Sequence, residues 1–191
     1  MITAPSTAVS HLARPVGVRI AATLAGAIVV AIAAQFALPL PGTPVPFTFS
    51  PLAVLVVGAL LGPRFGAASL VTYLAMGAAG LPVFAPLGAP GLARLFGPTG
   101  GYLLAYPLAA AFAGWVVHRA ERPTLLACLG ACLGAMTIIF VGGLSQLMII
   151  TGNLGAAFAA GVLPFLLADL AKVILASLIV HRLSPLTRAL S

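Results

Sequence analysis

Asp169 and Lys172 are the residues of this sequence with the clearest capacity for chemistry. They stand three residues apart in an apolar stretch, residues 162–180, and that spacing places both side chains on one face of a helix. A charged side chain inside a bilayer costs several kcal/mol and therefore faces a cavity or a partner. The pair either forms a salt bridge that locks the helices together or binds a small ligand with both hydrogen-bond donors and acceptors. We favour the ligand site.

The other titratable residues form no recognisable catalytic or metal centre. Glu121 is the only other acidic residue, and Cys128 and Cys132, which share a helix face, have no His, Asp or Glu beside them. We interpret the two cysteines as small packing residues. The three histidines stand at predicted cytoplasmic ends: His11, His118 and His181. An intramembrane enzyme needs several such groups together, so we predict no enzyme, no metal and no cofactor.

A glycine-rich run at residues 97–102 forms a corner between the second predicted loop and the following helix, and this corner is a further candidate binding site. The run lacks the Gly-Lys-Ser/Thr ending of a P-loop, so the chain shows no means of hydrolysing ATP itself. The glycines permit close backbone approach, and we predict that Thr99 caps the following helix. Arg94 precedes the run by three residues. This corner therefore either holds an anionic group or places Arg94 at the lipid headgroups.

The composition decides what kind of protein must position these residues. Only 6% of the 191 residues are charged and 62% are hydrophobic, whereas a soluble domain carries about 25% charged residues. So few charges cannot cover a water-facing surface, and we predict a single polytopic membrane bundle. The net charge of +7 does not indicate nucleic-acid binding, because the basic residues are scattered between apolar segments.

Six apolar segments predict an all-α membrane protein, a six-transmembrane-helix bundle with two structured outer loops. The predicted spans are residues 16–37, 51–61, 65–79, 99–117, 124–150 and 162–180. Clustered prolines and glycines make residues 38–46 and 81–98 the two loops, because proline interrupts a helix. Residues 62–64 break the helix, and the second and third spans are predicted to form a tight hairpin. Residues 118–123 form a short polar turn and residues 151–161 a small-residue connection.

The distribution of basic residues predicts the orientation. With six spans, one side of the membrane collects seven of the nine: Arg14, Arg19, Arg64, Arg119, Arg122, Arg182 and Arg188. The other side holds only Arg94. Because Lys and Arg accumulate on cytoplasmic loops, both termini are expected in the cytoplasm. We predict one transmembrane domain over residues 16–183, with cytoplasmic tails at residues 1–15 and 184–191.

A set of short motifs, in order along the chain, resembles the BioY family. These are Pro44-Val45-Pro46-Phe47-Thr48, Gly62-Pro63-Arg64-Phe65-Gly66, Tyr73 with Gly77, Gly80-Leu81-Pro82-Val83-Phe84, Gly97-Pro98-Thr99-Gly100-Gly101-Tyr102-Leu103, and Asp169 with Lys172. BioY proteins are the biotin-specific substrate-binding (S) components of energy-coupling-factor (ECF) transporters. The resemblance implies biotin capture from outside a bacterial inner membrane, with a transmembrane T component and two ATP-binding A subunits as partners.

The resemblance also implies site residues. Asp169 and Lys172 would contact the polar groups of biotin, with the ureido N–H groups donating to Asp169. Lys172 would meet either the ureido carbonyl or the carboxylate. Tyr73 and Tyr102 either line the pocket or serve as interfacial and packing residues, and Arg94 is a weaker candidate for the carboxylate.

Two further residues belong to the implied loop contacts, Thr48 and Ser50. The family commonly carries Gln two places after this threonine, where the present chain has Ser50. Serine is shorter and lacks the amide, so this contact departs from the family pattern.

Small residues on the first span fit docking to a T component. Ala21 with Ala25, Ala22 with Gly26, and Ala27 with Ala31 form small-xxx-small pairs. Ordinary packing inside the bundle is the alternative. A stand-alone secondary transporter and an S component for a related small vitamin are the alternative functions. One acidic site and the lack of a clear inverted repeat disfavour the secondary transporter.

Overall fold

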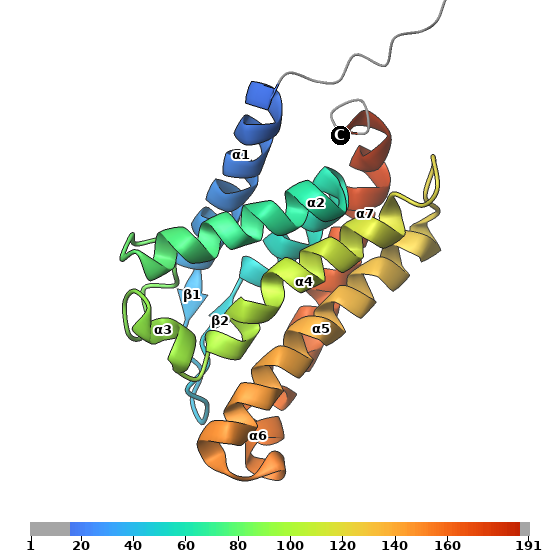
Figure 1. The fold of residues 1–191 in the computed structure, drawn as a ribbon. Helices are drawn as coiled ribbons and strands as arrows, with labels where there is room; N and C mark the ends of the chain where they lie inside the picture. Colours follow the sequence, from blue (N-terminus) through green and yellow to red (C-terminus); the bar gives the residue numbers. More distant parts are fainter. Residues whose placement is uncertain (1–15, 188–191) are drawn as a thin grey trace, which may run out of the picture.

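The computed structural model describes residues 16–187, and long apolar helices dominate it (Figure 1). The helices are α1 (Val16–Gln35), α2 (Ser50–Ala78), α3 (Ala93–Phe96), α4 (Gly100–Val117), α5 (Leu125–Thr151), α6 (Leu154–Gly161), a 3-10 turn (Leu163–Phe165) and α7 (Leu166–Thr187). Two short strands, β1 (Ala37–Leu38) and β2 (Phe47–Thr48), pair antiparallel with Ala37 opposite Thr48. The hairpin spans residues 37–48, which are the first predicted loop (residues 38–46) and the residues next to it.

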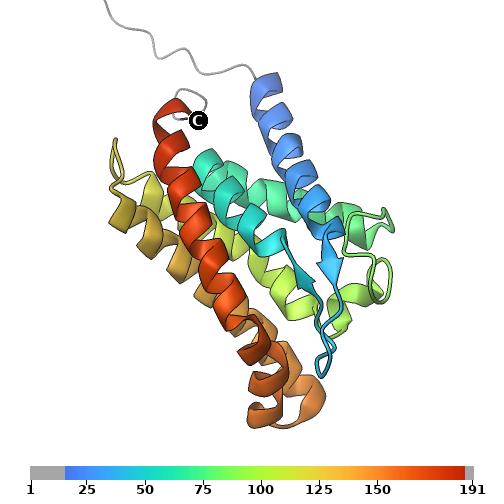
Figure 2. The same cartoon turned by 180° about the vertical axis from the view of Figure 1, so that it is seen from behind.

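The two predicted spans around residues 62–64 are the two legs of α2. Gly62 has φ +81° and ψ 175°, and Pro63 follows it, so the helix bends sharply at this point. A Cβ at position 62 would also lie 3.1 Å from Cε1 of His118. Figures 1 and 2 show the two legs leaving the bend in different directions. Over residues 16–187, five helices are long and apolar enough to cross a membrane, and the bend turns α2 into two of the six predicted segments.

Three boundaries differ from the sequence prediction. Residues 151–161 were expected to be a connection, but α6 forms there. Gly152 ends α5 in the left-handed conformation (φ +66°), and the Asn153 side chain then accepts a hydrogen bond of 3.0 Å from the Ala156 N–H to start α6. The last helix continues past the predicted end of the sixth span at residue 180 to Thr187. Conversely, α1 stops at Gln35 rather than residue 37, where β1 begins.

The packing is that of a bundle whose surface faces lipid. Large apolar side chains point outward, as Leu167 (85% exposed) and Ile149 (82% exposed) illustrate. Alanines fill the interior, including Ala110, Ala131 and Ala176, each fully buried. At the contact of α2 with α4, a Cβ on Gly58 would lie 2.5 Å from the Ala110 Cα, so only glycine allows this approach.

The elements divide between two ends of the bundle. The start of α1 and the end of α7 lie together at one end, while α6, α3 and the tip of the hairpin lie at the other (Figures 1 and 2). This is the arrangement expected for a protein with both termini on one side. The predicted tail at residues 1–15, with Arg14, lies outside the described residues, as do residues 188–191, with Arg188.

Candidate substrate pocket

The pocket lies among β2, α3 and the starts of α4 and α7, with about 630 Å³ of empty space, part of it open to the outside. All seven residues predicted to bind substrate line it: Thr48, Ser50, Tyr73, Arg94, Tyr102, Asp169 and Lys172. They come from the β2 strand, both legs of α2, α3, α4 and α7.

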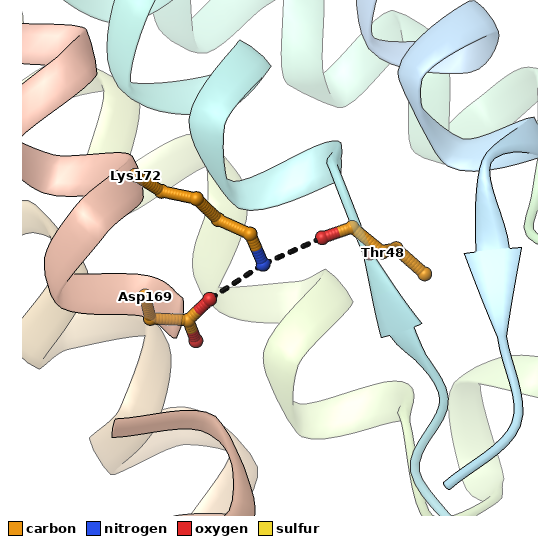
Figure 3. Close-up of polar contacts among 3 residues, drawn as sticks. All are labelled: Thr48, Asp169 and Lys172. Atoms are coloured by element: carbon orange, nitrogen blue, oxygen red, sulfur yellow. Dashed lines mark hydrogen bonds and ion pairs between the residues drawn. The ribbon is translucent and has the colours of Figure 1, made fainter. Parts of the chain in front are cut away.

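Asp169 and Lys172 meet inside the pocket wall, on one face of α7. The Lys172 Nζ lies 2.6 Å from the Asp169 Oδ1 and donates a second hydrogen bond of 2.7 Å to the Thr48 carbonyl (Figure 3). The ammonium also lies 3.8 Å from the centroid of the Phe47 ring, a cation–π contact. Both charged residues are buried, with exposed fractions of 6% for Asp169 and 5% for Lys172.

The structure shows the salt bridge, and the ligand-binding role of the pair stays a prediction. The salt bridge is present, yet it lines a cavity rather than filling the space between helices. A buried ion pair contributes little to stability by itself, because desolvation offsets the attraction. Only Oδ1 of Asp169 meets the ammonium, and the other carboxylate oxygen points away from it in Figure 3. The arrangement offers an acceptor and a held cation to a polar ligand.

An aromatic wall continues the pocket. Tyr73, 1% exposed, contacts the Phe84 ring edge-to-face at 5.4 Å and stacks with Tyr106 at 6.5 Å between ring centroids. The Tyr102 hydroxyl donates a 2.6 Å hydrogen bond to the Gly161 carbonyl at the end of α6, so its ring faces the pocket while its polar end fixes α6. Neither tyrosine is a lipid-interface anchor, because both are buried.

Arg94 is buried in the pocket wall rather than placed at lipid headgroups. Its exposed fraction is 6%, and its two Nη atoms donate to the carbonyls of Ala85 and Leu87. Among the described residues, its Nε has no hydrogen-bond partner. Burial lowers the pKa of the Arg94 guanidinium below its ordinary value, but arginine remains charged at neutral pH. The site thus holds a second cation.

The remaining predicted residues contribute through short contacts. Thr48 supplies its main-chain carbonyl to Lys172. Ser50 is 3% exposed and lies within side-chain hydrogen-bond reach of Tyr106. Thr99 occupies the N-cap position of α4 as predicted, but within residues 16–187 its side chain makes no capping hydrogen bond. Its backbone is nearly helical (φ −95°, ψ −8°), whereas a capping side chain usually needs an extended backbone.

Sequence reasoning missed part of the wall, notably Phe84 and Tyr106. Tyr106 stands four residues after Tyr102 on α4, so helical spacing alone places both on one face. Phe84 lies in an irregular segment, where no periodicity predicts the direction of a side chain. Elsewhere, Cys128 and Cys132 are buried in the α5 core, and no group of three potential metal ligands occurs among residues 16–187.

The predicted docking residues on α1 divide into two sets. Ala21 and Ala25 are exposed, while Gly26 and Ala27 are buried against the bundle. A Cβ on Gly26 would lie 2.5 Å from the Ser69 Oγ, so this glycine serves the packing of α1 on α2. Exposure leaves Ala21 and Ala25 available to a partner helix.

The sequence model of the BioY family matches residues 7–189, nearly the whole chain. The chain belongs to the BioY family. This agrees with the motifs noted in the sequence and with a transport protein rather than an enzyme.

Three similar proteins are named as BioY transporters of biotin. The probable biotin transporter BioY of Pyrococcus horikoshii is 36% identical over 140 residues, covering 73% of this chain and 81% of the relative. The biotin transporter BioY of Thermotoga maritima is 35% identical over 147 residues, covering 77% and 85%. That of Rhodobacter capsulatus is 35% identical over 173 residues, covering 84% and 90%.

A crystal structure of the S-component for biotin from an ECF-type ABC transporter has the same fold. The superposition has a TM-score of 0.78 and covers 86% of this chain and 89% of the other, at 24% sequence identity. The predicted S-component fold, a six-helix membrane bundle, is therefore confirmed.

Proposed function

We propose that this BioY-family protein binds biotin and serves as the substrate-binding S component of an ECF-type transporter for biotin uptake. One observation carries the proposal: seven residues selected from the sequence, spread from position 48 to position 172, converge on one pocket. Relatives that are named biotin transporters, and that match most of the chain, support the choice of ligand.

The pocket offers a complement to each part of biotin. Asp169 accepts the ureido N–H groups, and Lys172 donates to a carbonyl or carboxylate oxygen. The aromatic wall around Tyr73 and Tyr102 takes the bicyclic ring and the aliphatic chain by apolar burial. Arg94, a second buried cation at the side of the pocket formed by α3, suits the carboxylate.

Uptake further requires an energy source and a docking surface. The chain lacks a P-loop, so ATP hydrolysis belongs to two A subunits, coupled through a T component. The exposed Ala21 and Ala25 on α1 suit a close helix contact with that T component. The basic residues gathered at one end favour an inner-membrane protein with both termini in the cytoplasm. In this scheme residues 16–183 are the transmembrane domain, flanked by cytoplasmic tails.

Calorimetric titration of the purified protein in detergent tests the proposal. We expect tight binding of biotin, weaker binding of dethiobiotin and no binding of thiamine. A folded sample that ignores biotin but binds another vitamin would redirect the assignment to a related ligand. A stand-alone secondary transporter is distinguished by uptake in cells: the S component requires a co-expressed ATPase module, and the secondary transporter does not.

A further inference from the structure

Residues 81–98, here called the covering segment, close one side of the pocket. The segment supplies Phe84, Ala85 and Arg94 to the pocket lining. It contains four prolines and only one turn of regular structure, α3. Few backbone hydrogen bonds of its own are available to hold it, so its position depends on contacts from the surrounding helices.

Gln35, the last residue of α1, holds the beginning of the covering segment. Its Nε2 lies 3.3 Å from the Pro82 carbonyl oxygen, 3.4 Å from that of Val83 and 3.2 Å from that of Phe84. The same nitrogen lies 3.1 Å from the Ala31 carbonyl oxygen in its own helix. The two hydrogens of this amide therefore have three successive loop carbonyls and one carbonyl of α1 within reach, so that the amide links the loop to the end of α1.

The Gln35 contact controls a residue of the pocket wall. The Phe84 ring packs edge-to-face on Tyr73 and lies directly over Gly77 in α2, where a Cβ would overlap it. Phe84 is 6% exposed. Fixing its main chain therefore fixes the ring that closes the pocket beside Tyr73.

Gln146 on α5 holds the other end of the segment. Its Nε2 donates hydrogen bonds of 2.9 Å to the Leu95 carbonyl and 2.7 Å to the Gly97 carbonyl. These carbonyls flank the end of α3, the helix that carries Arg94. A Cβ on Gly100 would lie 2.7 Å from the same nitrogen, so a glycine there leaves room for the amide.

From these contacts we propose that Gln35 and Gln146 are positioning residues that clamp the covering segment over the pocket from its two ends. Neither belongs to the pocket lining, so they act through Phe84 and Arg94. The clamp sets the rate at which a bound ligand leaves, because dissociation requires the segment to lift. For biotin as that ligand, the inference rests on the proposed function.

The chain offers matched controls on the same two helices. Thr23 on α1 donates its hydroxyl to the Arg19 carbonyl at 3.0 Å, and Ser145 on α5 donates to the Val141 carbonyl at 2.7 Å. Both hydrogen bonds stay within their own helix. Thr23→Val and Ser145→Ala therefore remove a polar contact without touching the covering segment.

The test compares Gln35→Met and Gln146→Met with these controls in the full-length protein in detergent. Methionine keeps the side-chain length and removes the donors. Release of labelled biotin into excess unlabelled biotin is expected to be about tenfold faster in each variant, equivalent to about 1.4 kcal/mol. The controls are expected to release biotin at the wild-type rate, and all four variants to keep the wild-type unfolding midpoint without biotin.

Trypsin provides a second measurement that does not depend on biotin. Arg94 is buried, and lifting the segment exposes the bond that follows it. Cleavage after Arg94 without ligand is expected to be faster in both methionine variants than in the wild type and controls. Wild-type rates of release and cleavage in both variants would overturn the clamp. A wild-type protein that binds no biotin would instead overturn the proposed function, and the cleavage rates would still decide the clamp.

Discussion

Replacement of Asp169 by asparagine is the most direct test of the pocket. The substitution keeps the shape of the side chain and removes its charge. The carboxylate lies 2.6 Å from the Lys172 Nζ and lines the pocket. A hydrogen bond to a charged group contributes about 1.5–3 kcal/mol. Because about 1.4 kcal/mol corresponds to a tenfold change in affinity, biotin is expected to bind at least about tenfold more weakly.

The same substitution should leave the bundle folded. Lys172 keeps the Thr48 carbonyl at 2.7 Å and the Phe47 ring at 3.8 Å, and the asparagine oxygen still accepts a hydrogen bond. The assay is calorimetric titration with biotin, paired with thermal unfolding of the ligand-free protein. Biotin affinity equal to wild type in a folded Asp169→Asn sample would refute the reasoning and make the carboxylate structural.

The double variant Asp169→Leu/Lys172→Met separates the two interpretations of the pair. Replacing both members of a buried ion pair by apolar residues is often neutral or stabilising. We therefore expect near-normal unfolding with lost biotin binding. Recovery of tight binding in the double variant would show that the pair only maintains the pocket.

Three further predictions concern other parts of the molecule. Arg94→Met should weaken the binding of biotin more than the binding of uncharged biotin amide. The ratio of the two affinities, measured by calorimetry, should fall by about tenfold. Equal losses for both ligands would exclude a contact of Arg94 with the carboxylate. Gly62→Ala should destabilise the bundle by more than about 1 kcal/mol in thermal unfolding, because φ at this position is +81° and the new Cβ approaches His118. An unchanged unfolding midpoint would contradict that strain. Ala21→Leu/Ala25→Leu should leave biotin binding intact but reduce uptake by cells that express the ATPase module, whereas uptake at the wild-type level would exclude this face from docking.

Local sequence rules were sufficient for several features. Apolar runs predicted the spans. Four of them have the length of about 20 residues that a full crossing requires, and two, at residues 51–61 and 65–79, are shorter. The bend at Gly62-Pro63 followed from the chemistry of glycine and proline. The pairing of Asp169 with Lys172 also followed locally, since helical spacing alone brings them together.

Other features depended on residues too similar to their surroundings to be recognised. The α6 helix was missed because its small residues resemble a linker, although Asn153 provides the cap that starts it. Gly26 matched a docking pattern by spacing, but its burial against Ser69 assigns it to internal packing. Alanine-rich sequences carry small-xxx-small pairs on every face, so only the folded arrangement separates exposed pairs from buried ones.

The sequence by itself therefore determined the membrane class, the apolar segments, the family motifs and the buried charged pair, because each depends on composition or on neighbours within one helical turn. The tertiary structure alone decided that Arg94 turns inward, that Phe84 and Tyr106 complete the wall, and that Gln35 and Gln146 reach the covering segment. These contacts join residues 47 to 51 positions apart in the case of the two glutamines. No periodic pattern in the sequence predicts contacts between residues so far apart in the chain, because these contacts form only when the helices pack.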